Sequence, residues 1–516
     1  MKNSFFILSA TIFFLLYYSE NICGQNPVCG NTESNHSKQT DVLDCSKSSD
    51  SWANIYKTKE HYTPGPDMPI KTLHVNLNIW QRSDGTGNLS NIPEHIARLE
   101  QIMEWVNMKY ENVNPNANPP LTYPVESFTD SKIRIVLDSI YFYQDPSSDS
   151  SYYYGGYGYQ TYGHNILLDN YIKNNFPERT RVLNIHLTGS EWPGVGGYSD
   201  YGSIESFYRR NPDMADDPVH DWWFHLHWSH EIGHSFDLWH TYDIAWQQNC
   251  KLTYYDFLTD LYDINFPCTG YCDICLITDD NNNLMGGAGE GHITGLQMGI
   301  IHRSTMLRNL HNINYNLRDH VTGYTNTPYE VTQDETWDFS IKFYQDIIVK
   351  DGNTLTIQCE VQMVPNAKII VEPGAELIID GGIITNEYYY NIPWQGIQVW
   401  GNKNESQQPL QGQPLKQGKL VLKNDAIIEN AIIAVDLWKP DGYSTTGGIV
   451  YADNATFSNN TKSVHAVHYR NFNPYFPEIE WNNFSNFKNC TFEITEDYLG
   501  NETFYKHVDL AHVAKF

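Results

Sequence analysis

The chain has 516 residues, enough for two or three domains with a sizeable hydrophobic core. Its formal net charge of −28 at pH 7 disfavours nucleic acid and anionic membrane surfaces as partners, because both are negatively charged. The same acidic balance suits a soluble exported protein.

The first 24 residues have the organisation of a secretory signal peptide. Lys2 gives a basic start, an apolar run covers residues 5–18, and Gly24 provides a plausible cleavage point. The apolar run is too short and wrongly flanked for a stable membrane span. We therefore expect a secreted protein without a membrane span. Its mature chain would begin with a polar lead or short pro-segment at residues 25–65.

From residue 66 the pattern becomes that of a folded domain. Alternating apolar residues predict strands near residues 73–79, 133–137 and 182–187. Apolar residues at helical spacing, with Pro93 in a first-turn position, predict a helix over residues 93–110. A stretch rich in glycine and serine, residues 189–203, precedes a second helix.

The second helix carries the residues that point to chemistry. The sequence H-E-I-G-H at residues 230–234 places His230 and His234 one turn apart on one helix face, where both can bind one ion. His240 becomes a third ligand if the chain turns back after about residue 236. Three protein ligands with an open fourth position are typical of catalytic zinc, and Glu231 can then act as general base on the zinc-bound water. The alternative is a set of ordinary surface or core histidines.

This stretch resembles the metzincin metalloprotease signature H-E-x-x-H-x-x-G-x-x-H. Within that clan it is most similar to the pappalysin or cytophagalysin-type peptidases, because Gly233, Leu238 and the pair His240-Thr241 stand at matching positions. The resemblance implies an α+β metzincin-type zinc protease domain over residues 66–325, acting on a protein or peptide substrate. In that fold an edge strand binds the substrate in extended form, and we expect residues 182–187 to lie near that edge.

Two positions depart from the family pattern. Asp237 stands where the family has a glycine, whose positive φ ends the helix. Aspartate adopts that region more readily than most residues, so we expect the turn to form. The sequence N-L-M-G-G at residues 283–287 resembles the Met-turn, which puts Met285 beneath the zinc ligands, with the family's closing helix at residues 293–302. Gly287 occupies a position where many relatives carry a tyrosine.

Cysteines and acidic residues between the two motifs suggest further sites. Removal of residues 1–24 leaves eight cysteines, and an even number in an exported chain favours disulfides. Cys29 and Cys45 are expected to pair. Asp279 and Asp280 lie in a loop where a structural calcium ion or a solvated turn fits equally well. Four further cysteines cluster between the two motifs, and we expect them to form two disulfides rather than a second zinc site or a redox pair. They are Cys250, Cys268, Cys272 and Cys275.

After about residue 326 the character of the sequence changes. Short β-runs alternate with Asn, Gly and Pro turns, and residues 454–457 and 489–492 resemble each other. Repeats of strand and turn are typical of a β-solenoid, most like a right-handed parallel β-helix, with a β-sandwich as the alternative. We expect residues 326–516 to form an accessory domain that could contact polysaccharide.

The sequence thus predicts a secreted zinc endopeptidase with an α+β protease domain followed by an all-β solenoid. The competing hypothesis is a non-catalytic adhesive or carbohydrate-binding protein built on a protease-like scaffold. Asp237 and Gly287 are the two residues that favour it.

Overall fold

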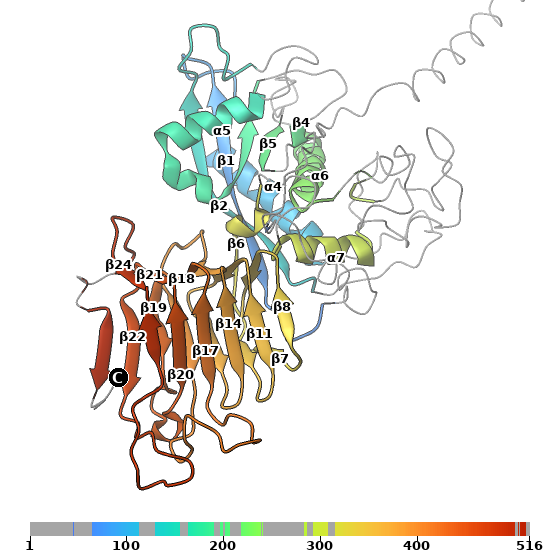
Figure 1. Cartoon of the computed structure of the whole chain (residues 1–516). Coiled ribbons are helices and arrows are strands. Elements are labelled where there is room, and N and C mark those ends of the chain that lie inside the picture. Colours follow the sequence, from blue (N-terminus) through green and yellow to red (C-terminus); the bar gives the residue numbers. More distant parts are fainter. Residues whose placement is uncertain are drawn as a thin grey trace, which may run out of the picture.

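The computed structural model describes residues 45, 64–112, 130–154, 164–189, 197–199, 202–206, 218–238, 240, 283–285, 293–307, 315–500, 504 and 506–511. Figure 1 shows an α/β part above a solenoid of stacked strands. None of the helices in the described ranges has the length and apolarity that crossing a membrane requires.

The α/β part is built on one mixed sheet with strand order β2-β1-β3-β5-β4. The pairs β1–β2, β1–β3 and β3–β5 are parallel, whereas β4 pairs antiparallel with β5 at one edge and β6 pairs antiparallel with β1. The strands are β1 (Lys71–Gln81), β2 (Ile133–Gln144), β3 (Leu183–Leu187), β4 (Gly197–Ser199), β5 (Ser203–Ser206) and β6 (Val321–Gly323).

The helices of this part cover the sheet and frame the candidate site. The helix predicted over residues 93–110 is confirmed as α4, which buries Leu99, Met103, Val106 and Tyr110. The Tyr110 hydroxyl donates a hydrogen bond to the carbonyl of Ser229 and so ties α4 to α6. The helices are α4 (Pro93–Glu111), α5 (His164–Asn175), α6 (Pro218–Ser235) and α7 (Gly295–Ser304), with short 3-10 turns η2 (Pro177–Arg181) and η6 (Leu317–His320).

One expectation about the sheet is wrong. The strand predicted at residues 182–187 forms as β3, but it lies inside the sheet between β1 and β5 rather than near the edge. The edge on that side is β4, which falls in the stretch rich in glycine and serine. Strands of three or four residues give too little periodicity to be recognised, and the pairings of β5 with β3 and of β4 with β5 are tertiary contacts.

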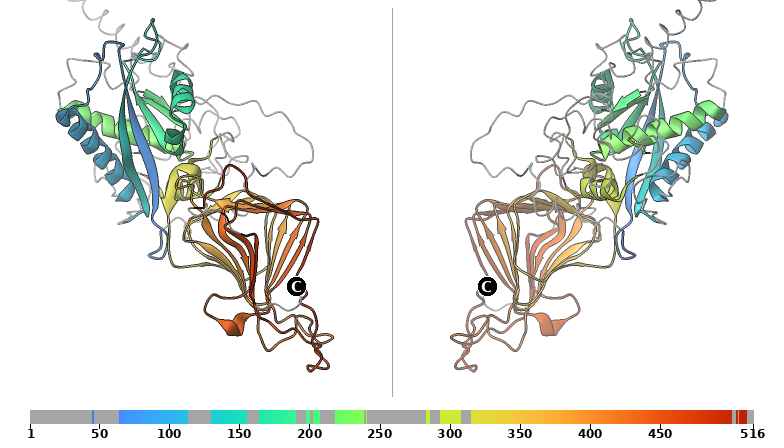
Figure 2. Two further views of the ribbon diagram at one scale, coloured as in Figure 1. Left: turned by 90° about the vertical axis from the view of Figure 1, so that its left-hand side faces the viewer. Right: turned by 90° about the vertical axis from the view of Figure 1, so that its right-hand side faces the viewer.

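The C-terminal part is a solenoid of parallel strands in stacked sheets. Successive coils contribute one strand to each of three sheets, and every pairing between them is parallel, which rules out the antiparallel β-sandwich alternative. Figure 2 shows the sheets as the walls of the solenoid. The 7-stranded sheet consists of β7 (Tyr329–Val331), β10 (Ile347–Val349), β13 (Lys368–Val371), β16 (Trp394–Val399), β19 (Ala431–Asp436), β22 (Lys462–Val467) and β25 (Val508–Ala511).

Side chains at equivalent positions of successive coils stack in the solenoid core. Phe457 and Phe492 are paired neighbours whose rings stack with centroids 4.8 Å apart, so the resemblance between residues 454–457 and 489–492 reflects adjacent coils. The second sheet consists of β8 (Glu335–Trp337), β11 (Thr354–Ile357), β14 (Glu376–Asp380), β17 (Lys419–Lys423), β20 (Ile449–Asp453) and β23 (Asn486–Lys488). The third consists of β9 (Ile341–Phe343), β12 (Glu360–Met363), β15 (Ile383–Asn386), β18 (Ala426–Glu429), β21 (Ala455–Ser458) and β24 (Thr491–Glu493).

Asparagine and glycine form the turns between the second and third sheets. Gly381, Asn424, Asn454 and Asn489 follow consecutive strands of the second sheet, and all four have positive φ. Only glycine adopts this region freely, and asparagine tolerates it better than most residues. The recurring Asn and Gly therefore set where these four coils bend.

The solenoid packs directly on α7. The Tyr344 hydroxyl donates to the carbonyl of Thr305, and the backbone N–H of Lys342 donates to the carbonyl of Met306 at 2.8 Å. Leu307 forms a β-bridge with Ile341. Buried side chains of both parts belong to one continuous hydrophobic core. The first coil thus extends the packing of the α/β part.

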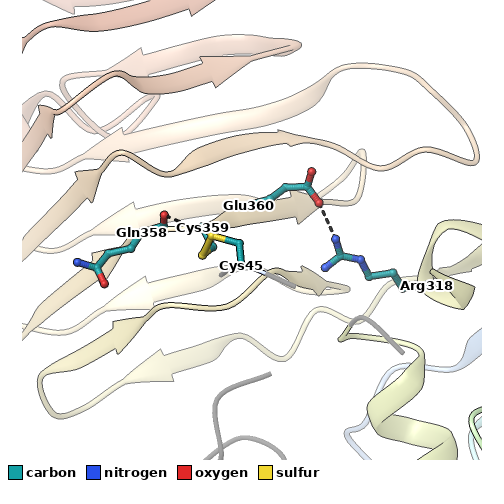
Figure 3. The surroundings of a disulfide bond; sticks show 5 residues. All are labelled: Cys45, Arg318, Gln358, Cys359 and Glu360. Carbon is teal, nitrogen blue, oxygen red and sulfur yellow. Dashed lines mark hydrogen bonds and ion pairs between the residues drawn. A yellow bond between two sulfur atoms is a disulfide. The ribbon is translucent and has the colours of Figure 1, made fainter. Parts of the chain in front are cut away.

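A disulfide joins Cys45 to Cys359, with 5.6 Å between their Cα atoms (Figure 3). The expected Cys29–Cys45 pair is therefore wrong, because Cys45 is bonded to the solenoid residue immediately before β12. The partner of a cysteine 314 positions away is set by the packing of the chain and cannot be read from spacing. Beside this disulfide, Arg318 of η6 donates to Glu360 at 2.5 Å.

Candidate metal centre

Three histidines converge at the end of α6. The Nε2 atom of His240 lies 3.1 Å from Nε2 of His230 and 3.2 Å from Nε2 of His234. Three nitrogens bound tetrahedrally to one zinc ion, each at 2.0–2.1 Å, stand about 3.3 Å from one another. The spacing of the three nitrogens therefore fits ligands of a single ion, and these residues could hold a metal.

Backbone carbonyls fix which ring nitrogen faces the centre. Nδ1 of His230 lies 2.7 Å from the carbonyl oxygen of Leu284, and Nδ1 of His234 lies 2.8 Å from that of Leu238. A carbonyl oxygen only accepts, so both Nδ1 atoms carry the proton and both Nε2 atoms present lone pairs. A proton on Nε2 of His240 could form a hydrogen bond with only one of the two neighbouring Nε2 atoms. A cation at the centre would bind the lone pairs of all three nitrogens.

The electrostatic setting keeps the rings of His230 and His234 neutral. Burial, the neighbouring His240 and His227 lower the pKa of His230 to about 3, against a smaller opposing effect of the Leu284 carbonyl. Burial and the two other cluster histidines hold the pKa of His234 well below its usual value. Neutral imidazole is the form that binds a metal, so the site needs no proton release from these rings at neutral pH.

A sharp turn after α6 brings His240 back to the helix. The backbone N–H of Asp237 donates to the carbonyl of His234, and that of Leu238 donates to the carbonyl of Gly233. This pair of bonds is the Schellman pattern, which places a left-handed residue just past the helix end. Asp237 fills that position with φ of +70°, so the turn forms without a glycine.

Glu231 lies between the first two ligands and is only 2% exposed. Its Oε1 atom lies 3.6 Å from Nδ1 of His227, one helical turn earlier. Burial lowers the pKa of His227 to about 4. His225 and His227 lie outside the histidine cluster, and the side chain of His220 lies outside the described residues.

The turn at residues 283–285 lies beneath the cluster and is held by α7. Met285 is fully buried, and the backbone N–H of Met285 donates to the side-chain oxygen of Asn283. The side-chain amides of Asn283 and Gln297 hydrogen-bond each other at 2.8 and 3.0 Å. Gln297 also forms a capping box with Thr294 at the start of α7. One helix therefore fixes the carbonyl of Leu284 that orients His230.

Sequence reasoning missed these supports. The T-x-x-Q pattern at residues 294–297 is a capping-box signal that could have revealed how α7 begins. The contribution of Leu238 and Leu284 is made by backbone carbonyls, which carry no sequence signal. The remaining predicted sites lie outside the described residues: Gly287, the calcium candidates Asp279 and Asp280, and Cys250, Cys268, Cys272 and Cys275.

Comparison with known proteins gives no relative. No family model, curated protein or solved structure matches the chain.

Proposed function

We propose that the chain is a zinc-dependent endopeptidase of the metzincin type, similar to the pappalysin-type peptidases. The observation that carries this proposal is the convergence of three histidines, with Nε2 of His240 3.1 Å from Nε2 of His230 and 3.2 Å from Nε2 of His234. The buried Met285 beneath the helix and the adjacent Glu231 support the same assignment.

Each residue has a defined task. His230, His234 and His240 would hold the ion, and the carbonyls of Leu284 and Leu238 keep two of the rings in the metal-binding tautomer. Zinc held there would supply Lewis acidity to polarise the scissile carbonyl and to lower the pKa of the attacking water.

Glu231 handles the proton. It accepts the proton of the attacking water and then delivers it to the leaving amine of the cleaved peptide. Its burial beside the ligands excludes bulk water as a competing acceptor.

The edge strand β4 supports binding of an extended peptide. It pairs antiparallel with β5 and packs against α6, with Nε2 of His227 only 2.6 Å from where a Cβ on Gly197 would stand. We propose that the outer edge of β4, which pairs with no other strand of the described residues, adds a substrate strand that would lie beside the helix carrying Glu231.

An extracellular location completes the proposal. Residues 1–24 have the pattern of a secretory signal, and a disulfide such as Cys45–Cys359 forms and persists in oxidising compartments. The non-catalytic alternative loses part of its basis, because Asp237 adopts the positive φ that the family glycine provides.

The test compares the wild-type chain with Glu231→Gln on a denatured protein substrate. We expect the wild type to cleave, a chelator to stop cleavage, and Glu231→Gln to bind zinc at the same stoichiometry while cleaving at least about 100-fold more slowly. His234→Ala is the matched variant that should lose the metal. A wild type that binds zinc but cleaves nothing would support the binding-protein hypothesis instead.

A further inference from the structure

The turn that brings in His240 is joined to α7 by a buried ion pair. Oδ2 of Asp237 lies 3.3 Å from Nη2 of Arg303, and their side chains are 1% and 2% exposed. Opposite charges at this depth are costly unless they remain paired, so neither group can move away from the other cheaply. The pair therefore restricts the turn as well as joining two elements.

The position of Asp237 makes this restriction relevant to the site. A φ of +70° costs more conformational energy for a non-glycine residue than for glycine, so contacts with the surrounding structure must stabilise it. Arg303, in the last turn of α7, provides such a contact. A glycine would make the turn without strain, but it would remove the ion pair with Arg303 of α7.

Two parts of the metal centre depend on the turn. The carbonyl of Leu238, directly after Asp237, accepts the hydrogen bond that orients His234. His240 follows two residues later and contributes its Nε2 to the cluster. A small rotation at residue 237 would therefore disturb one ligand and the orientation of another.

We propose that the Asp237–Arg303 pair is a positioning device that holds the third histidine at the metal centre. This inference rests on the proposed zinc site and adds two positioning residues to it. Because α7 also fixes the turn of Met285 through Gln297, one helix supports the ligands from both sides.

The experiment measures the zinc dissociation constant by competition with a chromophoric chelator, together with the melting temperature of the metal-free protein. Asp237→Asn keeps the shape and the tolerance of positive φ but removes the charge, and Arg303→Met removes the partner. Both should raise the dissociation constant on the order of 10-fold or more. Arg303→Lys keeps a positive charge and should recover part of the affinity.

The matched control is Arg98→Met. Arg98 of α4 pairs with Asp221 at the opposite end of α6, with Nη2 2.8 Å from Oδ1. Its loss should lower the melting temperature of the metal-free protein but leave the zinc dissociation constant unchanged. Asp237→Asn decides the question alone if Arg303→Met does not fold.

The outcomes separate the two proposals. If Asp237→Asn lowers only the melting temperature and binds zinc as tightly as the wild type, the pair is merely structural and the positioning role is wrong. If the wild type itself binds no zinc, the proposed function fails, and the positioning role fails with it.

Discussion

Gly233 and Met285 are packed so closely that no methyl group fits between them. A Cβ atom on residue 233 would lie 2.5 Å from Sδ of Met285, well inside van der Waals contact. The glycine within the H-E-x-G-H sequence therefore has a steric reason. It lets the methionine turn approach α6 and places the carbonyl of Leu284 against the ring of His230.

Gly233→Ala should consequently destabilise the protein. Alanine is favoured over glycine in a helix interior by about 1 kcal/mol, so an isolated helix would gain stability. Overpacking of the contact by the methyl group typically costs about 1–3 kcal/mol, so after the gain in helix propensity we expect the free energy of unfolding to fall by up to about 2 kcal/mol. Chemical denaturation of the metal-free protein measures this change.

The contact itself is tested by adding Met285→Ala to Gly233→Ala. Met285→Ala alone leaves a cavity and should cost about 2–5 kcal/mol. The double variant should lose less than the two single losses combined, because the added methyl group then occupies part of the vacated space. Fully additive losses would show that the two residues do not interact.

Lys342→Met should destabilise both parts of the molecule together. Lys342 is fully buried, with Nζ 2.9 Å from Oε2 of the equally buried Glu387, and it donates to the carbonyls of Arg318 and Val321. Removing it leaves a buried carboxylate unpaired, which typically costs about 3–5 kcal/mol. Since the two carbonyls belong to η6 and β6, we expect a single calorimetric transition at lower temperature.

A control for this change is Lys423→Met. Lys423 pairs with Asp380 on the solenoid surface, where the lysine side chain is 44% exposed, so its loss should cost less than about 1 kcal/mol. Two separate transitions in Lys342→Met, one for each part, would contradict the view that the first coil is part of the α/β fold.

Reduction or loss of the disulfide should lower the stability of the protein without altering its fold. Cys45→Ser removes the cross-link between Cys45 and Cys359, and we expect the free energy of unfolding to fall by about 2–5 kcal/mol. Cys490→Ser is the control, because Cys490 is not in a disulfide. Peptide mapping under non-reducing conditions should recover Cys45 linked to Cys359, and a Cys29–Cys45 peptide would contradict the structure.

The sequence predicts the parts of the fold that depend on periodicity. The strand β1 and the helix α4 are long enough for alternation or helical spacing to stand out, and the i, i+4 spacing of His230 and His234 directly describes a helix face. Repeated Asn and Gly turns likewise indicate the solenoid, because four successive coils bend at a left-handed residue between the second and third sheets.

Features made by packing could not be predicted in this way. The strand β5 forms because β3 offers it an edge, and β4 then pairs with β5. Cys45 meets Cys359 because the solenoid carries Cys359 to it. In the sequence Asp237 is only a departure from the family glycine, whereas the structure shows that it pairs with Arg303. The sequence identifies the three histidines that the structure brings together. Two of the groups that support them lie far along the chain, because Leu284 is 54 positions from His230 and Arg303 is 66 positions from Asp237.

The stability of the protein should rise with pH above neutrality because of Lys71. Its Nζ is buried, donates to the carbonyl of His302 at 3.2 Å, and lies 5.5 Å from the ring centre of Tyr344. Burial lowers the pKa of Lys71 from 10.5 to about 7. Between these two values the unfolded chain keeps the proton on this amine while the folded chain has lost it.

The sign of the effect follows from this difference. Below pH 7 both states are protonated, and the folded state bears the full cost of a buried ammonium group. As pH rises from about 7 towards 10.5, that cost is relieved, and the free energy of unfolding should increase by about 1.4 kcal/mol per pH unit from this residue alone. Urea denaturation at pH 7, 8 and 9 measures the slope.

Lys71→Met should remove this slope between pH 7 and 9, since methionine fills a similar volume and does not titrate. Lys350→Met is the matched control. Lys350 lies on the solenoid surface, and a hydrogen bond to Glu372 raises its pKa above 10.5, so its removal should leave the slope unchanged. An equal slope in Lys71→Met and the wild type would show that Lys71 stays protonated in the folded protein, with its charge balanced by the carbonyl of His302.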